Sequence, residues 1–482
     1  MTLTQKTLEG VIWSFAEQLG RRGVGIAVTL LLAWFLTPAD YGLVSMMAVF
    51  LAIATSLMDS GFREALIRLH RAGQADFDTA FYTNLVLGLF SYALLFAAAP
   101  FVALFYNEPR LVILMRVAGI VVIINSFQVV QSAILTRNLN FKIQLQATIA
   151  AGIASGIIAV FFAYMRLGVW ALIAQMLSAA FMTTVMLWRL QGWRPSFGFS
   201  LESLGSMYHF GCKLFLSGLI NTIFKNVYVV VIAKVFSATI AGYYFFADRI
   251  KELIISQLVG SIQAVTYPAL ASVQQDDIRL KAGYRKVIQV TTFLLFPIMA
   301  MIAALAEPIF LVFLPDQWLP AVPYLQLMCI AGLLYPLHSI NLDILKVKGR
   351  SDLFLYIEIF KLVILTVILS ISIRYGVFGI LIGQIISSVL AYIPNSYFSS
   401  KLINYPVREQ MTDCMPGFVL SCAVALMTYG AGFLIPWPAV VKLIVLGSLA
   451  AGFYMLCAYI FNVQALSFVM VMFREQKAKA GS

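Results

Sequence analysis

The sequence has little charge for its length. Only 11% of its 482 residues are Asp, Glu, Lys or Arg, and 61% are hydrophobic, whereas soluble globular domains carry roughly a quarter charged residues. No soluble core could cover this much apolar surface, so lipid must solvate most of the chain. Because apolar segments recur as far as the C-terminus without a long polar insertion, we expect one continuous helical bundle rather than several soluble domains.

Motifs for catalysis and metal binding are also missing. The chain has three His and five Cys, and it contains no P-loop, nucleophile elbow, paired His or Gly-rich phosphate loop. We therefore expect no catalytic residue, no metal site, no cofactor and no enzymatic activity. Without an ATPase motif, any energy that the protein needs would come from an ion gradient, with the ion unspecified, or from downstream removal of a substrate.

Apolar runs long enough to cross a membrane fill most of the chain. A membrane-spanning helix needs about 20 mainly apolar residues, and the sequence predicts an all-α membrane protein with about fourteen such helices. No small-residue cleavage site follows the N-terminus, so the first helix is expected to remain. The predicted spans are 9–36, 41–60, 79–104, 111–134, 145–165, 168–190, 207–234, 239–265, 285–306, 320–345, 353–374, 377–400, 415–435 and 440–462.

Basic residues predict the orientation of these helices. With the N-terminus placed in the cytoplasm, 20 of the 33 Lys and Arg fall in cytoplasmic segments. Three fall in outer segments (Arg110, Arg166 and Arg374), and the other ten lie within or at the ends of spans. Cytoplasmic loops of membrane proteins carry such an excess. We therefore expect both termini to be cytoplasmic, and we attribute the net charge of +12 to topology rather than to nucleic-acid binding.

Short sequence matches recur about 200 residues apart. Residues 166–173 resemble residues 374–381, and the turn at 39–42 resembles 240–243, while Gln131 matches Asn341 more weakly. Spans one to six thus match spans seven to twelve, which predicts two pseudo-symmetric six-helix lobes inserted the same way up. The predicted domains are an N-terminal lobe at 1–190, a cytoplasmic linker at 191–206, a C-terminal lobe at 207–400, and two further helices with a tail at 401–482. A short interfacial helix is expected at 200–208, before the seventh span.

Four segments resemble polysaccharide exporters. Residues 32–43, LAWFLTPADYGL, are similar to the LARxLxPxDFG signature near the end of the first helix in those proteins. Residues 59–68, DSGFREALIR, and 267–271, YPALA, resemble the cytoplasmic turns after their helices two and eight. Residues 137–142, RNLNFK, are similar to the loop after helix four in the colanic-acid and teichuronic-acid exporter branch. The ordered set extends over essentially the whole chain.

Through this set the chain resembles the Wzx-type O-antigen and exopolysaccharide flippases, whose superfamily includes the multidrug-and-toxin extruders and the MurJ lipid II flippases. The resemblance implies an alternating-access carrier with two six-helix lobes around a central cavity in the bacterial inner membrane. It also implies a substrate of undecaprenyl-pyrophosphate carrying an oligosaccharide repeat unit for exopolysaccharide or lipopolysaccharide synthesis. Membrane lipid is a further expected partner, polysaccharide polymerase and chain-length machinery are candidate partners, and nucleic acid is not expected.

Charged residues inside predicted spans are candidates for substrate binding, because a charge at bilayer depth is costly unless it faces protein or a wet cavity. Glu17 and Arg21 lie four residues apart and share a helix face, and a polar stripe on the seventh helix steps by four residues. A cationic cavity attracts a pyrophosphate. The predicted substrate-binding residues are Arg21, Arg22, Lys225, Arg249, Lys213, Glu17 and Asn221.

Some of these charges have a structural alternative. Arg21 can neutralise Glu17, and Glu358 can neutralise Lys361 three residues later. Arg116 and the isolated His209 and His338 are expected to be structural. The charged group in the eighth helix can pair internally or extend to the cytoplasmic face; it comprises Asp248, Arg249, Lys251 and Glu252.

Other functions remain open from the sequence. A multidrug or small-cation antiporter of the same fold would have an acidic cavity, whereas the central charges here are mostly basic. A lipid II flippase is a further alternative. A polysaccharide polymerase or ligase needs a large outer loop with Arg and His, but the longest predicted outer loop, 307–319, contains neither. No sequence feature favours a structural scaffold.

Overall fold

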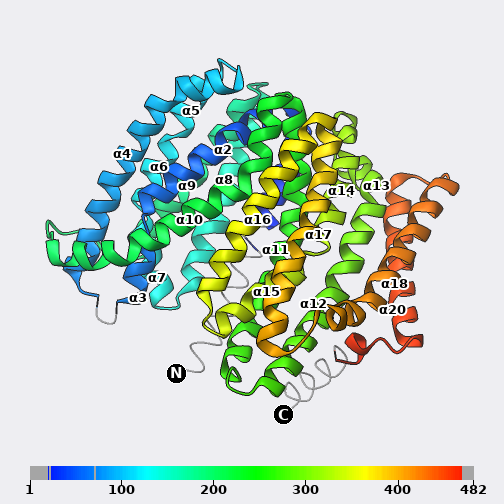
Figure 1. Cartoon of the computed structure of the whole chain (residues 1–482). Helices are drawn as coiled ribbons and strands as arrows, with labels where there is room; N and C mark the ends of the chain where they lie inside the picture. Colours follow the sequence, from blue (N-terminus) through cyan, green and yellow to red (C-terminus); the bar gives the residue numbers. More distant parts are fainter. Residues whose placement is uncertain (1–19, 21–22, 70–71, 469–482) are drawn as a thin grey trace, which may run out of the picture. The chain divides into compact units, whose positions relative to one another are not determined.

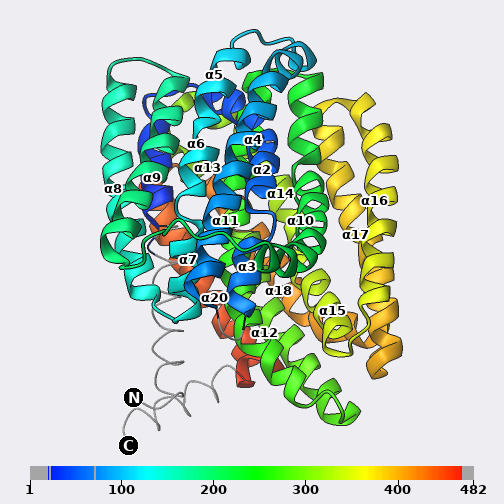
Figure 2. The ribbon, with the colours of Figure 1, turned by 90° about the vertical axis from the view of Figure 1, so that its left-hand side faces the viewer.

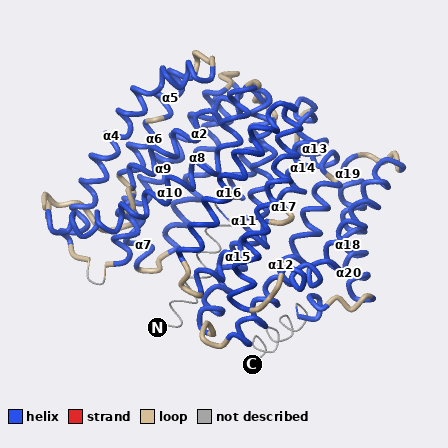
Figure 3. Tube along the Cα trace, in the orientation of Figure 1, coloured by secondary structure: helices blue, strands red, loops and turns tan. Residues whose placement is uncertain are grey.

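A computed structural model describes residues 20, 23–69 and 72–468, and all regular structure in these ranges is helical (Figures 1 and 3). The chain divides into two compact units, Met1–Phe245 and Phe246–Ser482. The helices of the first unit are α2 (Pro38–Asp59), α3 (Phe62–Arg68), α4 (Gln74–Tyr106), α5 (Leu111–Ala118), α6 (Ile120–Ser126), α7 (Val129–Arg137), α8 (Phe141–Tyr164), α9 (Val169–Leu190) and α10 (Leu201–Val235). Helix α11 (Ala238–Ser272) begins in the first unit and ends in the second.

The second unit is helical as well, which confirms the predicted all-α membrane class in the described residues. Its helices are α12 (Asp277–Ala304), α13 (Ala306–Phe313), α14 (Val322–Gly332), α15 (Tyr335–Val347), α16 (Ser351–Ser372), α17 (Gly376–Ile403), α18 (Val407–Leu434), α19 (Ala439–Val441) and α20 (Gly447–Ile460). In this unit α12 packs against α14, α17 and α18, α16 packs against α17, and α18 packs against α20. The predicted outer loop at 307–319 is largely helical, because α13 and the 3-10 turn Asp316–Ala321 occupy it.

In the first unit, α8 and α9 lie side by side and α2 packs against both α4 and α10 (Figure 2). Helix α2 starts sharply at Pro38, whose missing N–H is unneeded in a first turn. Thr37 caps the helix by accepting a hydrogen bond from the Asp40 N–H, and the Asp40 carboxylate accepts from the Thr37 N–H at 2.9 Å. The TPADYG part of the sequence signature is therefore a helix start.

The predicted linker between the lobes is an extended loop bound to α4. The N–H of Ser196 donates to Asp78 Oδ1 at 3.0 Å, and the N–H of Ser200 donates to Thr79 Oγ1 at 2.9 Å. Helix α10 begins at Leu201 and continues for 35 residues. Residues 201–208 are thus its first turns and not a separate interfacial helix, because Ser200 caps a helix that nothing then interrupts. The predicted lobe boundaries stay a prediction.

Fewer helices than the predicted fourteen qualify as membrane spans when length and apolar composition are the criteria. Ten helical stretches of the described residues are long and apolar enough to cross a membrane, or eleven if the bent pair Leu111–Ser126 and Val129–Arg137 forms one span. One of these stretches, Asp352–Ile403, contains both α16 and α17. Of the first predicted span, 9–36, residues 9–19, 21 and 22 lie outside the described residues, and Gly23–Ala33 forms an apolar helix that is too short to count as a span. The count of fourteen is not confirmed.

The two halves of the sequence repeat share a helix break. In the first unit the chain bends by 44° between Ser126 and Val129, and in the second, α14 ends at Gly332 and α15 begins at Tyr335. A fully buried amide follows each break. The amide nitrogen of Asn341 donates to the carbonyl of Leu337 at 2.7 Å, and that of Gln131 donates to the carbonyl of Phe127 at 2.8 Å in the orientation that satisfies both of its groups. Matching sequence positions thus make the same contact four residues back.

Asn341 is also the centre of a buried polar network in the second unit. Its oxygen accepts a hydrogen bond from the Tyr284 hydroxyl at 2.6 Å and another from Ser399. Its nitrogen lies 3.3 Å from the oxygen of Gln410, which also accepts from the Tyr392 hydroxyl. The network joins α12, α15, α17 and α18, and its polar groups satisfy one another inside an apolar bundle.

Candidate functional site

A polar cavity of about 580 Å³ lies within the first unit. Its walls come from α2, α3, α6, α7, α8 and α9. Hydroxyl and amide groups dominate its polar lining, and Asp59 and Arg63 add one negative and one positive charge. The lining residues are Thr55, Met58, Asp59, Arg63, Asn125, Gln128, Val129, Ser132, Thr136, Phe141, Gln144, Ala147, Thr148, Thr183 and Leu187.

The helix break described above helps to form this cavity. Positions 125, 128, 132 and 136 form a polar stripe along α6 and α7. Gln128 Nε2 donates to Asn125 Oδ1 at 2.7 Å, and Gln144 of α8 donates to Thr136 Oγ1 at 3.0 Å. The Arg63 N–H donates weakly to Asp59 Oδ1 at 3.4 Å. These groups can donate and accept hydrogen bonds, as recognition of a hydroxyl-rich molecule requires.

This cavity was not predicted from the sequence, because the candidate binding residues were chosen mainly for their charge. The signal was present as polar side chains at helical spacing in the fourth predicted span, which is mainly apolar. Hydroxyl and amide residues are common in membrane helices as ordinary packing groups. Only the arrangement of six helices distinguishes a cavity wall from such packing.

Two helix starts in the first unit approach each other more closely than side chains would allow. A Cβ on Gly42 of α2 would overlap the carbonyl oxygen of Ala238, and a Cβ on Gly242 of α11 would overlap the carbonyl oxygen of Pro38. The two contacts are related by a shift of 200 residues in both partners. The turns that match in sequence therefore meet in a reciprocal contact, and glycine is required at both positions. We call this contact the glycine pair.

Three of the predicted binding residues, Lys213, Asn221 and Lys225, belong to α10, and Arg249 belongs to α11. Asn221 and Lys225 lie exposed one turn apart on α10, and Arg249 is exposed on α11 in the second unit. Within the described residues, neither Lys225 nor Arg249 has an ion-pair partner. The side chain of Lys213 lies outside the described part of the structure. Convergence of these cations on one cavity stays a prediction.

The predicted cations of the first helix, Arg21 and Arg22, lie outside the described residues, as does Glu17. Their neighbour Gly20 is described, and it packs closely against α8. A Cβ placed on Gly20 would lie 3.0 Å from Leu145 Cδ1 and 3.2 Å from Ile149 Cδ1. These two residues adjoin Gln144 and Thr148 of the cavity wall.

Other intramembrane charges have structural partners. Lys361 pairs with Glu358 at 2.8 Å, as the structural alternative predicted, and Lys251 pairs with Asp248 at 2.5 Å. The guanidinium of Arg116 stacks on the ring of Phe96 at 4.1 Å. His338 is hydrogen-bonded through both ring nitrogens to side chains of α17, at 3.2 Å to Ser388 and 2.9 Å to Asn395. Asp343 contacts both Lys346, at 3.2 Å, and Gln263.

No group of three or more potential metal ligands is found in the described part of the chain. The helices and the cavity together define a polytopic helical membrane protein with a polar cavity inside one of its compact units. The chain belongs to the polysaccharide biosynthesis protein family, whose sequence profile matches residues 31–323. The family resemblance stated from the sequence is thereby confirmed.

The chain aligns with its relatives over most of its length. It is 24% identical over 444 residues to the lipopolysaccharide biosynthesis protein WzxC of Escherichia coli K12, covering 90% of this chain and 89% of the relative. It is 22% identical over 438 residues to the teichuronic acid biosynthesis protein TuaB of Bacillus subtilis 168, covering 89% of both chains. It is 26% identical over 337 residues to the succinoglycan biosynthesis transport protein ExoT of Rhizobium meliloti 1021, covering 70% of this chain and 68% of the relative.

Solved structures share the fold. The lipid II flippase MurJ in an inward closed conformation superposes with a TM-score of 0.74 at 13% identity, covering 94% of this chain and 98% of that protein. An inward-facing MATE family transporter of the MOP superfamily superposes with a TM-score of 0.59 at 17% identity, covering 82% and 96%. At these identities the likeness concerns the fold alone.

Proposed function

We propose that the protein is a flippase that carries a lipid-linked oligosaccharide across the bacterial inner membrane for exopolysaccharide or lipopolysaccharide synthesis. The observation that carries this proposal is the relationship to polysaccharide biosynthesis proteins over about 90% of the chain. A fold shared with a lipid II flippase supports it, because that protein is itself a flippase.

The substrate in this proposal is undecaprenyl-pyrophosphate bearing an oligosaccharide repeat unit, moved by alternating access. The pyrophosphate needs cations, for which Arg21, Arg22, Lys225 and Arg249 are the candidates. The sugar needs neutral hydrogen-bonding groups, and the polar cavity of the first unit offers hydroxyl and amide groups of that kind. Both termini lie in the cytoplasm, and an ion gradient or substrate removal supplies the energy. The protein is a carrier and not an enzyme.

Deletion of the gene tests this proposal. The expected result is accumulation of lipid-linked repeat units in the cytoplasmic leaflet together with loss of surface polymer. Enzymatic digestion of the exposed glycolipid in spheroplasts and in inverted vesicles would assign the leaflet. If polymer disappears while the repeat units reach the outer leaflet at the normal level, the protein acts after translocation, and the proposal is wrong.

A further inference from the structure

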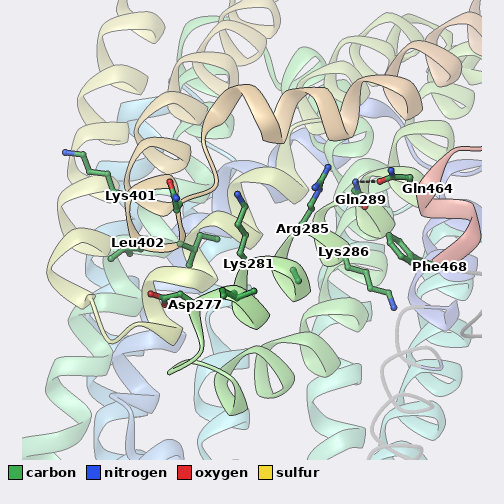
Figure 4. Close-up of a pocket in the computed structure, with 13 residues that line it drawn as sticks. Asp277, Lys281, Arg285, Lys286, Gln289, Lys401, Leu402, Gln464 and Phe468 are labelled. Atoms are coloured by element: carbon green, nitrogen blue, oxygen red, sulfur yellow. Dashed lines mark hydrogen bonds between the residues drawn. The ribbon is translucent and has the colours of Figure 1, made fainter.

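A basic pocket of about 670 Å³ lies in the second unit, apart from the polar cavity (Figure 4). Its walls come from α12, the turn between α17 and α18, and the segment after α20. Four of its lining side chains are cationic and one, Asp277, is a carboxylate. The lining residues that concern the argument are Asp277, Lys281, Arg285, Lys286, Lys401 and Gln464.

Internal ion pairs neutralise only part of this positive charge. Lys281 pairs with Glu409 at 2.8 Å, and Arg285 pairs with Asp413 at 2.5 Å. The one lining carboxylate, Asp277, is already paired with Lys348 at 2.6 Å.

Two lysines keep an uncompensated charge. Lys286 lies 4.9 Å above the ring of Phe468, and Lys401 lies 4.6 Å above the ring of Tyr397. Within the described residues, neither has a carboxylate partner. Figure 4 shows them at opposite ends of the pocket, with Lys281 and Arg285 between them. The pocket therefore has a surplus of two positive charges and fits an anion.

An apolar groove adjoins the pocket. A second cavity of about 570 Å³ shares Gln289 and Gln464 with the first and continues along α18 and the segment after α20. Its α18 wall changes from polar to apolar: Thr412 and Asp413 come first, followed by Pro416, Leu420 and Ala423. Asp413 and Ala423 are ten residues apart, which is about 15 Å along a helix and half of a hydrocarbon core of roughly 30 Å.

We propose that the basic pocket binds the phosphate of an anionic phospholipid, and that one acyl chain of this lipid occupies the adjoining groove. The basic pocket complements the anionic headgroup of such a lipid, and the apolar groove beside it, which is one leaflet deep, complements an acyl chain. A soluble anion would not occupy the groove. Basic pockets between membrane helices bind lipid headgroups in the same manner. The inference does not depend on the transported substrate.

Lipid retention by the purified full-length protein tests this inference. The protein is titrated with dioleoyl phosphatidylglycerol and, separately, with dioleoyl phosphatidylcholine, and bound lipid is counted by native mass spectrometry. We expect preference for phosphatidylglycerol, and a loss of affinity of about thirtyfold in the K286Q/K401Q double variant, which corresponds to about 2 kcal/mol for the two lysines together. Equal retention of the two lipids by the native protein would overturn the proposal.

The matched control is R279Q/R408Q. It removes two positive charges from α12 and α18, at exposed positions that do not line the pocket, and it should retain the lipid as the native protein does. If the control loses as much affinity as K286Q/K401Q, the effect is one of net charge and the site is refuted. Elution of both variants as monodisperse protein excludes misfolding as the cause.

Two further experiments distinguish a bound lipid from a bound free phosphate. Ala423→Trp fills the groove without changing charge and should weaken phosphatidylglycerol binding by about fivefold, because it excludes part of one acyl chain. Millimolar sodium pyrophosphate should leave the bound lipid in place. Displacement by pyrophosphate, together with unchanged binding in Ala423→Trp, would show a soluble-anion site and overturn the assignment to lipid.

Discussion

The side chain of Asn341 connects four helices of the second unit through hydrogen bonds that are shielded from solvent. Its two polar atoms serve several partners at once, so the loss of one side chain leaves several buried groups unsatisfied. A buried donor or acceptor without a partner costs about 1–3 kcal/mol. Polar residues of this kind hold membrane helices together, where apolar contacts alone do not distinguish one neighbour from another.

Asn341→Leu should lower the free energy of unfolding by about 2–4 kcal/mol, because Tyr284 and Gln410 lose a buried partner. The measurement is the thermal midpoint of the purified protein in detergent, followed by tryptophan fluorescence. Asn226→Leu is the control, since Asn226 is only partly buried and makes a single bond to the Thr222 carbonyl at 2.8 Å. It should lose less than about 1 kcal/mol. Equal thermal midpoints for the two variants would show that the buried network of Asn341 stabilises the protein no more than the single hydrogen bond of Asn226.

Arg21 requires a functional test, because it lies outside the described residues. If it holds the pyrophosphate, Arg21→Lys should keep partial polymer export, although it loses the bidentate fork of a guanidinium. Arg21→Ala should lose most export while the protein still inserts. If Arg21 only neutralises Glu17, the double variant E17Q/R21Q should restore function, since no unpaired charge remains. Full export by that variant at normal protein level would refute substrate binding by Arg21.

Lys225 offers a second test of the cation hypothesis. Lys225→Glu should reduce export more than Lys225→Ala, because it adds repulsion of the pyrophosphate to a lost attraction. The assay is surface polymer per cell at matched protein levels. Lys225→Gln, which removes the charge and keeps a polar side chain, is the matched neutral change. Equal export by the Glu and Ala variants of Lys225 would mean that its charge does not act on an anionic substrate.

At the scale of helices, the glycine pair makes a definite prediction. Gly42→Ala and Gly242→Ala should each cost about 1–3 kcal/mol of stability, since each added methyl meets a backbone carbonyl that cannot move aside. Gly260→Ala is the control, because a Cβ there meets nothing within 4 Å. Thermal midpoints in detergent provide the measurement. The double variant should cost less than the two single changes together, because the first methyl already separates the helix starts. Strict additivity would show that the two contacts are independent.

Most helices of the described chain could be predicted from the sequence, because apolar runs of helical length are unmistakable when lipid is the solvent. The break at Ser126–Val129 could not, since no proline marks it, whereas Pro336 marks the corresponding break before α15. The pairing of Lys361 with Glu358 was predictable from their spacing. The contact between Asp343 and Gln263 was not, because its partners are 80 residues apart. Local chemistry is visible in a sequence, and tertiary proximity is not.

At the scale of the whole molecule, topology is the property that remains to be measured. We predict cytoplasmic termini, on the basis of the distribution of Lys and Arg. In a cysteine-free background, Asp316→Cys should react with an impermeant maleimide added to intact spheroplasts, and Arg279→Cys should not. Arg279 is a better probe than the neighbouring Lys281, because its side chain is 79% exposed and Lys281 is held by Glu409. Labelling of Arg279→Cys from outside would contradict the predicted orientation, in which the termini are cytoplasmic.

The glycine pair contains no charged side chain at its points of contact, because it joins the main chain of Gly42 and Gly242 to the carbonyls of Ala238 and Pro38. Dissolved ions screen charges and leave such a contact unaffected. The pair Lys281–Glu409 is exposed by about a third on both sides and weakens as ionic strength rises, whereas Asp413 is nearly buried in its pair with Arg285. A salt titration therefore acts selectively on this protein: it loosens the basic pocket of the second unit and leaves the glycine pair of the first unit unchanged.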